Sequence, residues 1–411
     1  MQRPSNDDPR AARRAWVLSW IAYATYYTGR KGFGVAKKSI EHDLGIGRGG
    51  LAAIDTGHLV FYALGQFANG IAADRIGARR LVGYGMLASA AACVFFGASS
   101  SAIALLVAFS LNGYAQSTGW PGTTRAVAEW TDDSNRRRVM ALWCTCYQVG
   151  GIAASAGAAW LLRFGWRSAF FGPAVLLAIV AVAVLLGLPS GAGSPAGGAQ
   201  ESNDDRRARA QAMRAALAST TLWCFGASYF AIKLIRYSLL FWLPYYLSDD
   251  LAYAPSTAGY LSTAFEVGGV LGVVGTGLFT HRARGVSRPA LSAAMLVMLA
   301  AMIVLYTKVA PLGIAANAVG LALIGFCLFG PDSLLSGAVA QDAGGPHAAA
   351  TATGLVNGIG SLGAILQGAL NAWVSRAYGW HAVFISFVTF SIVAALALVP
   401  TFAKDAKKPQ T

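Results

Sequence analysis

The sequence WVLSWIAYATYYTG, residues 16–29, contains no charged side chain, and the two residues that follow it, Arg30 and Lys31, are both basic. An apolar stretch of about 20 residues is the length that crosses the roughly 30 Å hydrocarbon layer of a bilayer as an α-helix. Arg30 comes 14 residues after Trp16. At a rise of ~1.5 Å per residue it lies about 21 Å along such a helix. The stretch therefore predicts a membrane span with cations inside it.

The composition of the whole chain agrees with a membrane protein. Of the 411 residues, 55% are hydrophobic and 12% are charged, whereas about 25% are charged in a soluble domain. The five cysteines all lie in apolar runs and follow neither a disulfide framework nor a zinc pattern. The net charge is +14, but the basic residues are scattered through short loops, which argues against a nucleic-acid partner.

Apolar segments recur along the chain and predict an all-α membrane protein with twelve transmembrane helices. They lie at about 16–37, 51–73, 80–98, 102–126, 138–162, 168–188, 217–247, 256–280, 289–307, 312–337, 348–374 and 380–402.

The basic residues between these segments are unevenly distributed, which predicts the orientation in the membrane. Basic residues concentrate in loops on the cytoplasmic side, so both termini are expected in the cytoplasm and the protein is expected in a bacterial inner membrane. The predicted cytoplasmic loops hold Arg75, Arg79, Arg80, Arg136, Arg137, Arg138, Arg206, Arg207, Arg209, Arg214, Arg282, Arg284 and Arg288. The opposite loops hold Lys37, Lys38, Arg48, Arg163, Arg167, Lys308 and Arg376.

One stretch, residues 190–211, is rich in Gly, Ala, Ser and charge instead of apolar side chains. Such a composition is typical of a flexible linker. It divides the chain into a predicted six-helix bundle at 1–188, a cytoplasmic linker at 189–215 and a second six-helix bundle at 216–411.

The two halves resemble each other, which predicts two pseudo-symmetric bundles. Tyr23 and Arg30 match Tyr229 and Arg236 at an offset of 206 residues, and GWRSAFF in the first half matches GWHAVFI in the second. Parallel repeats of this kind place a substrate site near the middle of the membrane at the interface of the repeats.

Four basic side chains, Arg30, Lys31, Lys233 and Arg236, fall within predicted spans. Each costs on the order of 2.5–3.5 kcal/mol at the centre of a bilayer, so the four together cost about 10–14 kcal/mol if additive. We therefore expect them to face an aqueous cavity and bind an anion. A guanidinium group binds phosphate oxygens bidentately and stays charged, so one Arg from each half favours a phosphate ligand. The alternative is a set of structural ion pairs with the acids Glu266, Asp55 and Asp332, which lie in or near spans.

Polar and aromatic residues accompany these cations. Tyr23, Tyr27 and Arg30 are spaced i, i+4 and i+7, which places them on one face of the first span. Trp120 either lines the cavity or packs between helices. The side chains expected beside the cations are Tyr23, Tyr27, Tyr62, Gln66, Trp120, Tyr147 and Gln148.

The loop after the second span reads GIAADRIGARR, residues 70–80. It resembles the signature of the major facilitator superfamily. The resemblance implies that Asp74 and Arg75 form charge pairs that close the cytoplasmic side without touching substrate.

A closer resemblance appears span by span. The motifs that carry it are YATYYTGRKGFG, GWPGTTR, WCTCYQVGG, FAIKLIRYSLLFWLPYYL, FEVGGVLG and TGLVNGIGSLGA. They resemble the organophosphate:phosphate antiporter family, which implies exchange of inorganic phosphate for an organic phosphate, with the phosphoryl group bound by Arg30 and Arg236. The sequence departs from the glycerol-phosphate members at Gln66, Tyr147 and Lys233, so the organic group is left open.

The sequence therefore predicts a monomeric transporter and not an enzyme, with phosphate and a small organic phosphate as ligands and with no cofactor or metal. Two alternatives stay open. One is a proton-coupled carrier of another organic anion or a phosphonate, with Glu266 as the proton site; otherwise Glu266 pairs with Lys233 or Arg236 and tunes the site. The other is a membrane sensor of organophosphates.

Overall fold

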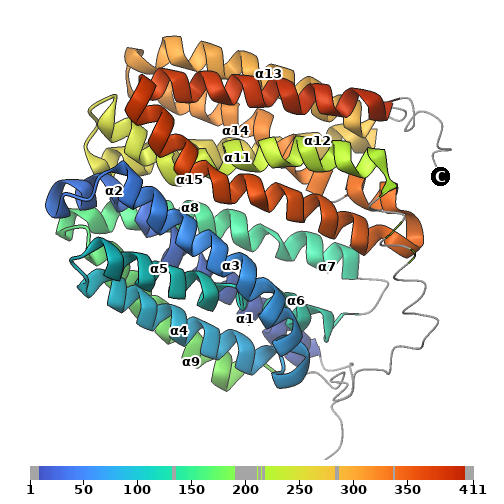
Figure 1. Ribbon diagram of the computed structural model, residues 1–411. Coiled ribbons are helices and arrows are strands. Elements are labelled where there is room, and N and C mark those ends of the chain that lie inside the picture. Colours follow the sequence, from blue (N-terminus) through green and yellow to red (C-terminus); the bar gives the residue numbers. More distant parts are fainter. Residues whose placement is uncertain are drawn as a thin grey trace, which may run out of the picture. The chain divides into compact units, whose positions relative to one another are not determined.

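The computed structural model describes residues 9–131, 136–189, 219–282, 287–336 and 338–402, together with 211, 214 and 218. Every regular element in these described ranges is a helix (Figure 1). Two compact units divide the chain. Unit 1 runs from Met1 to Ala199 and also includes Leu247–Asp249 and Tyr253–Tyr260; unit 2 holds the rest.

Unit 1 is built from the first nine helices. α3 packs against α5, α4 against α9, and α2 against α8, while α1 contacts α6, α8 and α9. Their bounds are α1 (Pro9–Tyr26), α2 (Thr28–Leu44), α3 (Arg48–Ile76), α4 (Ala78–Ala98), α5 (Ala102–Gln116), α6 (Gly119–Ala128), α7 (Arg136–Trp143), α8 (Thr145–Leu161) and α9 (Ser168–Gly187).

Unit 2 is built from the later helices, in which α13 packs against α14 and α15. α12 approaches α14 closely, since a Cβ on Gly268 would lie 1.9 Å from the carbonyl oxygen of Ala322. The bounds are α11 (Thr220–Asp249), α12 (Pro255–Arg282), α13 (Arg288–Val309), α14 (Ile314–Ser336) and α15 (Ala338–Leu398).

Three predicted spans of unit 1 are interrupted. The first is divided into α1 and α2 at Tyr27, the fourth into α5 and α6, and the fifth into α7 and α8. Near each interruption a Ser or Thr hydroxyl donates to a carbonyl three residues earlier: Thr28 to Thr25, Ser117 to Tyr114 and Thr145 to Leu142. Such bonds compete with the regular helical hydrogen bonds and bend a helix.

The last two predicted segments, 348–374 and 380–402, both fall within α15. Gly379 lies between them with a φ of 80°, a left-handed conformation that glycine adopts without strain. Glycine at this position therefore allows the chain to turn between the two segments.

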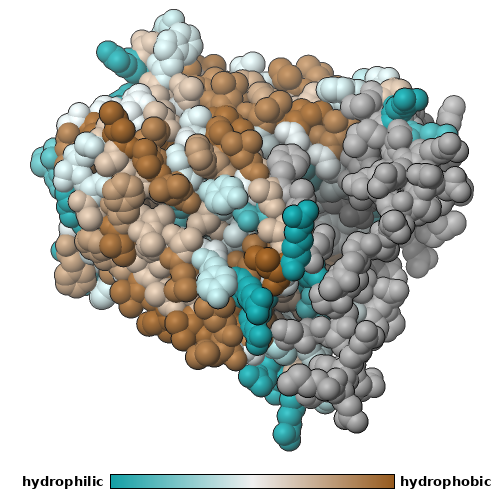
Figure 2. Space-filling view, turned by 60° about the horizontal axis from the view of Figure 1, so that its bottom comes forward, coloured by the Kyte–Doolittle hydropathy of each residue, from teal (hydrophilic) through white to brown (hydrophobic). Residues whose placement is uncertain are grey.

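Much of the outer surface is suited to lipid. Among the described residues, seven helices are long and apolar enough to cross a membrane, and large apolar side chains such as Leu64, Ile103 and Leu186 are exposed on helices. Figure 2 shows apolar side chains over broad areas of the face in view. The observed elements agree with the predicted all-α membrane protein.

Candidate functional site

Arg30 lies in the first turn of α2, next to the interruption at Tyr27. Its Nε donates a hydrogen bond of 2.7 Å to Oε1 of Gln116 at the end of α5. Its guanidinium carbon lies 4.7 Å from the ring centre of Tyr27 and 5.1 Å from that of Tyr62 on α3. A cation over the face of an aromatic ring is stabilised by the ring's electrons. The predicted grouping of Arg30 with Tyr27 and Tyr62 is thus present in unit 1.

A buried polar network lies behind this arginine. Gln116 is fully buried, and its Nε2 lies 3.4 Å from Oγ of Ser89. Ser89 donates to Oδ1 of Asn112 at 2.6 Å, and Nδ2 of Asn112 donates to the carbonyl of Gly29 at 2.7 Å. The network therefore returns to the backbone beside Arg30, and it fixes the amide that holds the guanidinium.

Sequence reasoning did not select Gln116. The available signal was an amide side chain inside an apolar span, just before the motif GWPGTTR.

His58 was also missed. It is buried on α3, its ring stacks on Phe109 at 4.3 Å and on Tyr62 at 6.4 Å, and its Nδ1 lies 3.1 Å from the carbonyl oxygen of Phe109.

The other predicted aromatic residues of unit 1 form a packed group. Tyr23 is buried, and its ring centre lies 5.9 Å from that of Tyr27 and 5.5 Å from those of Trp120 and Trp143. Trp120 thus packs between helices, although 38% of it remains exposed. Tyr147 packs against the same hydrophobic core.

The remaining predicted residues of unit 1 differ in exposure. Lys31 is only 4% exposed, whereas Gln66 and Gln148 are half-buried. At the cytoplasmic signature Arg75 is exposed, and the side chain of Asp74 lies outside the described residues.

Lys37 was expected in an outer loop, but that assignment was wrong. It lies within α2, is fully buried and forms an ion pair with buried Asp55 on α3. α2 continues to Leu44, so the helix extends beyond the apolar stretch that hydropathy detects. A carboxylate on the neighbouring helix compensates the buried charge.

Lys38 is also within α2, and it belongs to a cluster of charges in unit 1. Its Nζ lies 2.8 Å from Glu41 and 2.6 Å from Asp249, and Arg48 lies 2.6 Å from the same Asp249. Asp249 ends α11, and the clustering of the chain places it in unit 1.

Arg236 lies on α11 in unit 2. Its Nη1 donates a hydrogen bond of 2.7 Å to Oδ2 of Asp332 on α14, and its guanidinium carbon lies 4.5 Å from the ring centre of Phe329. The ion pair with Asp332, considered from the sequence as an alternative, is therefore present. Glu266 on α12 is buried in the same unit, with 7% exposed.

Lys233 lies one turn before Arg236 and interacts with α15. Its Nζ lies 3.3 Å from Oγ of Ser361 and 3.5 Å from the carbonyl of Asn357, and 5.1 Å from the ring centre of Tyr229. Unit 2 thus places two cations, Arg236 and Lys233, on one helix with partners from two other helices.

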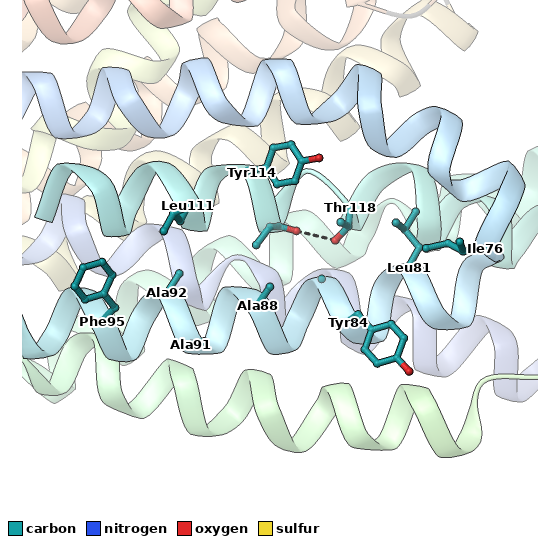
Figure 3. Close-up of a pocket in the computed structure, with 12 residues that line it drawn as sticks. Ile76, Leu81, Tyr84, Ala88, Ala91, Ala92, Phe95, Leu111, Tyr114 and Thr118 are labelled. Carbon is teal, nitrogen blue, oxygen red and sulfur yellow. Dashed lines mark hydrogen bonds between the residues drawn. The ribbon is translucent and has the colours of Figure 1, made fainter. Parts of the chain in front are cut away.

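A separate cavity of about 600 Å³ opens on the surface of unit 1 between α4 and α5. Leu111 and Tyr114 on α5 line it together with Ala88 and Ala92 on α4, and Figure 3 shows Leu111 pointing toward Ala92. The Thr118 hydroxyl donates to the carbonyl of Ala115. The residues that line the cavity carry no charge, so it suits an acyl chain better than an anion.

Comparison with known proteins places this arrangement in a family. The model of the Major Facilitator Superfamily matches residues 19–368. The chain is 28% identical to glucose-6-phosphate exchanger SLC37A2 of Bos taurus, covering 95% of this chain and 94% of that protein. It is also 28% identical to sugar phosphate exchanger 3 of Xenopus laevis, covering 87% and 80%.

A solved structure supports the same fold. A bacterial homolog of the human lysosomal transporter Spinster superposes with a TM-score of 0.77 at 17% sequence identity, covering 98% of this chain and 100% of that one. The resemblance to the organophosphate:phosphate antiporter family that the motifs indicated is confirmed by the exchangers among the relatives. The chain belongs to the Major Facilitator Superfamily.

Proposed function

We propose that this protein exchanges inorganic phosphate for a small organic phosphate by alternating access, with Arg30 and Arg236 as the ligands of the phosphoryl group. The observation that carries the proposal is the placement of one half-buried arginine in each unit, each held by a hydrogen bond to a side chain from another helix. Two guanidinium groups supply the planar donor pairs that a phosphoryl group accepts. Relatives named as sugar phosphate exchangers support the same class of substrate.

The proposed coupling follows from charge. Bound phosphate places negative charge beside these cations and stabilises them beyond the partners that they have within the protein. A ligand shifts a conformational equilibrium only by the difference in its affinity for the two states. If the change between inward-open and outward-open states requires the compensated site, the protein exchanges one anion for another and does not return empty.

The remaining cations and polar residues have supporting roles in this proposal. Lys233 and Lys31 add positive charge, and Tyr27 and Tyr62 hold the Arg30 guanidinium. Asp74 and Arg75 are proposed to form the cytoplasmic charge pairs. Both termini are proposed to lie in the cytoplasm of a bacterium, because the basic loops then follow the usual distribution.

The test is counterflow of labelled phosphate in proteoliposomes that contain the native chain, Arg30→Lys or Arg236→Lys. Lysine keeps the charge but lacks the two parallel donors, so we expect both variants to lose most of the exchange. Arg163→Lys is the matched control, because Arg163 lies 5.5 Å from the ring of surface-exposed Trp160 and outside both arginine sites. Full exchange by both Arg30→Lys and Arg236→Lys would refute the proposed role.

A second candidate is proton-coupled uptake of an organic anion. The buried carboxylates of Glu266 and Asp332 in unit 2 favour it, because ionisable residues inside membrane spans mark ion and proton pathways. Uptake that follows an imposed pH gradient and is lost in Glu266→Gln would support this candidate over phosphate exchange.

A further inference from the structure

The two arginines are held by chemically different groups. In unit 1 the partner of Arg30 Nε is the amide oxygen of Gln116, at 2.7 Å. In unit 2 the partner of Arg236 Nη1 is the carboxylate oxygen of Asp332, also at 2.7 Å. Both partners come from the fourth span of their half of the chain, on α5 and on α14. The amide is neutral, whereas the carboxylate carries a charge opposite to that of Arg236.

The Asp332 carboxylate occupies the kind of contact that a phosphoryl oxygen would make. Hydrogen bonds of about 2.7–2.9 Å join guanidinium groups to carboxylates and to phosphates alike. The side chain of Asp332 is 10% exposed and that of Arg236 is 21% exposed, so water screens this pair only weakly. A substrate anion that takes Nη1 must therefore displace a carboxylate that already holds it.

The second oxygen of Asp332 adds an independent observation. Oδ1 is buried and has no hydrogen-bond partner within the described part of the chain. A buried charged oxygen without a donor is costly, so the carboxylate is held less firmly than a fully hydrogen-bonded one. Lys233 lies one turn before Arg236 on the same helix, so a second cation is close to this ion pair.

We propose that Asp332 is an internal competitor of the substrate anion at Arg236. This inference rests on the proposed function, and it adds that the two halves contribute unequally to binding. The hydrogen-bond partner of Arg30 Nε is the neutral amide of Gln116, so a phosphoryl group displaces no carboxylate from that nitrogen. Arg236 binds the phosphoryl group only after Asp332 has released Nη1. The free energy of this binding is therefore reduced by the cost of separating the existing ion pair.

Two substitutions exchange the chemistry of the partners. Asp332→Asn keeps the shape and removes the negative charge beside Arg236. Gln116→Glu introduces a carboxylate beside Arg30 and is the matched opposite change. The measurement is the dissociation constant for inorganic phosphate, by calorimetric titration of the purified full-length chain, with the thermal unfolding midpoint recorded for each variant.

Asp332→Asn is expected to bind phosphate about tenfold more tightly than the native chain, and Gln116→Glu about tenfold more weakly, which corresponds to about 1.4 kcal/mol in each direction. Phosphate should also raise the unfolding midpoint of Asp332→Asn more than that of the native chain, because it replaces the missing counter-charge of Arg236.

Unchanged or weaker phosphate binding by folded Asp332→Asn would overturn the inference and leave the proposed function standing. If Asp332→Asn does not fold, Gln116→Glu decides: native affinity in that variant would show that a carboxylate at this distance does not compete. A native chain that binds neither inorganic phosphate nor sugar phosphates would overturn the proposed function itself, and the inference with it.

Discussion

Replacement of Gln116 by leucine tests whether the buried network in unit 1 orients Arg30 for binding. The substitution removes the 2.7 Å hydrogen bond to Arg30 Nε and the contact with Ser89, and it places an apolar side chain of similar size in a fully buried position. We expect phosphate affinity to fall because the guanidinium loses the partner that fixes its plane. Gln116 does not itself need to touch the ligand.

The magnitude follows from the contacts that are lost and kept. A hydrogen bond to a charged group contributes about 1.5–3 kcal/mol, equivalent to roughly 10- to 150-fold in a dissociation constant. The rings of Tyr27 and Tyr62 still hold the guanidinium at 4.7 and 5.1 Å. The lower end of the range, about a tenfold rise in the dissociation constant for phosphate, is therefore the expected result.

The assay is a double-mutant cycle in phosphate titrations of purified protein. If Gln116 acts through Arg30, then Gln116→Leu has little further effect once Arg30 is already lysine, because the residues are coupled. Gln367→Leu is the matched control: Gln367 is fully buried, accepts a hydrogen bond from Asn371 on the same helix and belongs to unit 2. Equal losses from Gln116→Leu in the native and Arg30→Lys backgrounds, or an equal loss from Gln367→Leu, would refute the reasoning.

Three further predictions concern charges outside that network. Asp55→Asn leaves Lys37 buried without its counter-charge and should cost about 3–5 kcal/mol of stability, seen as a lower thermal unfolding midpoint; combination with Lys37→Met should recover most of it, and no recovery would argue against the pair as the cause. Lys233→Met should weaken phosphate binding by about tenfold, whereas Ser361→Ala, which removes only the hydroxyl 3.3 Å from Nζ, should change it less; the same titration distinguishes them. Asp249→Asn removes a charge shared by two basic residues and should lower stability by about 1 kcal/mol at low salt, with a smaller difference in 1 M salt; a salt-independent loss would contradict an electrostatic origin.

The hydropathy of the sequence was sufficient to predict the class of fold, but it did not predict where the helices are interrupted. The apolar segments correspond to helices along the described chain, but α1 and α2 meet at an interruption near Tyr27 that the average polarity of the segment does not reveal. The hydroxyl of Thr28 donates a hydrogen bond to the carbonyl of Thr25. Mean hydropathy depends only on composition, so it does not detect such a bond. Lys37 shows the complementary error: its charge suggested a loop, and Asp55 on another helix makes its burial possible.

The sequence alone indicated a membrane-spanning chain, with matching motifs in its two halves and an arginine inside an apolar span of each half. These properties depend on the order of residues along one helix, because the cost of placing a charge in lipid is set locally. Only the tertiary structure decided what holds each arginine. Gln116 is 86 residues from Arg30 and Asp332 is 96 residues from Arg236. The packing and rotation of the helices against each other decide which side chain of a neighbouring helix reaches a given guanidinium. The pattern of residues within a single span does not predict this partner.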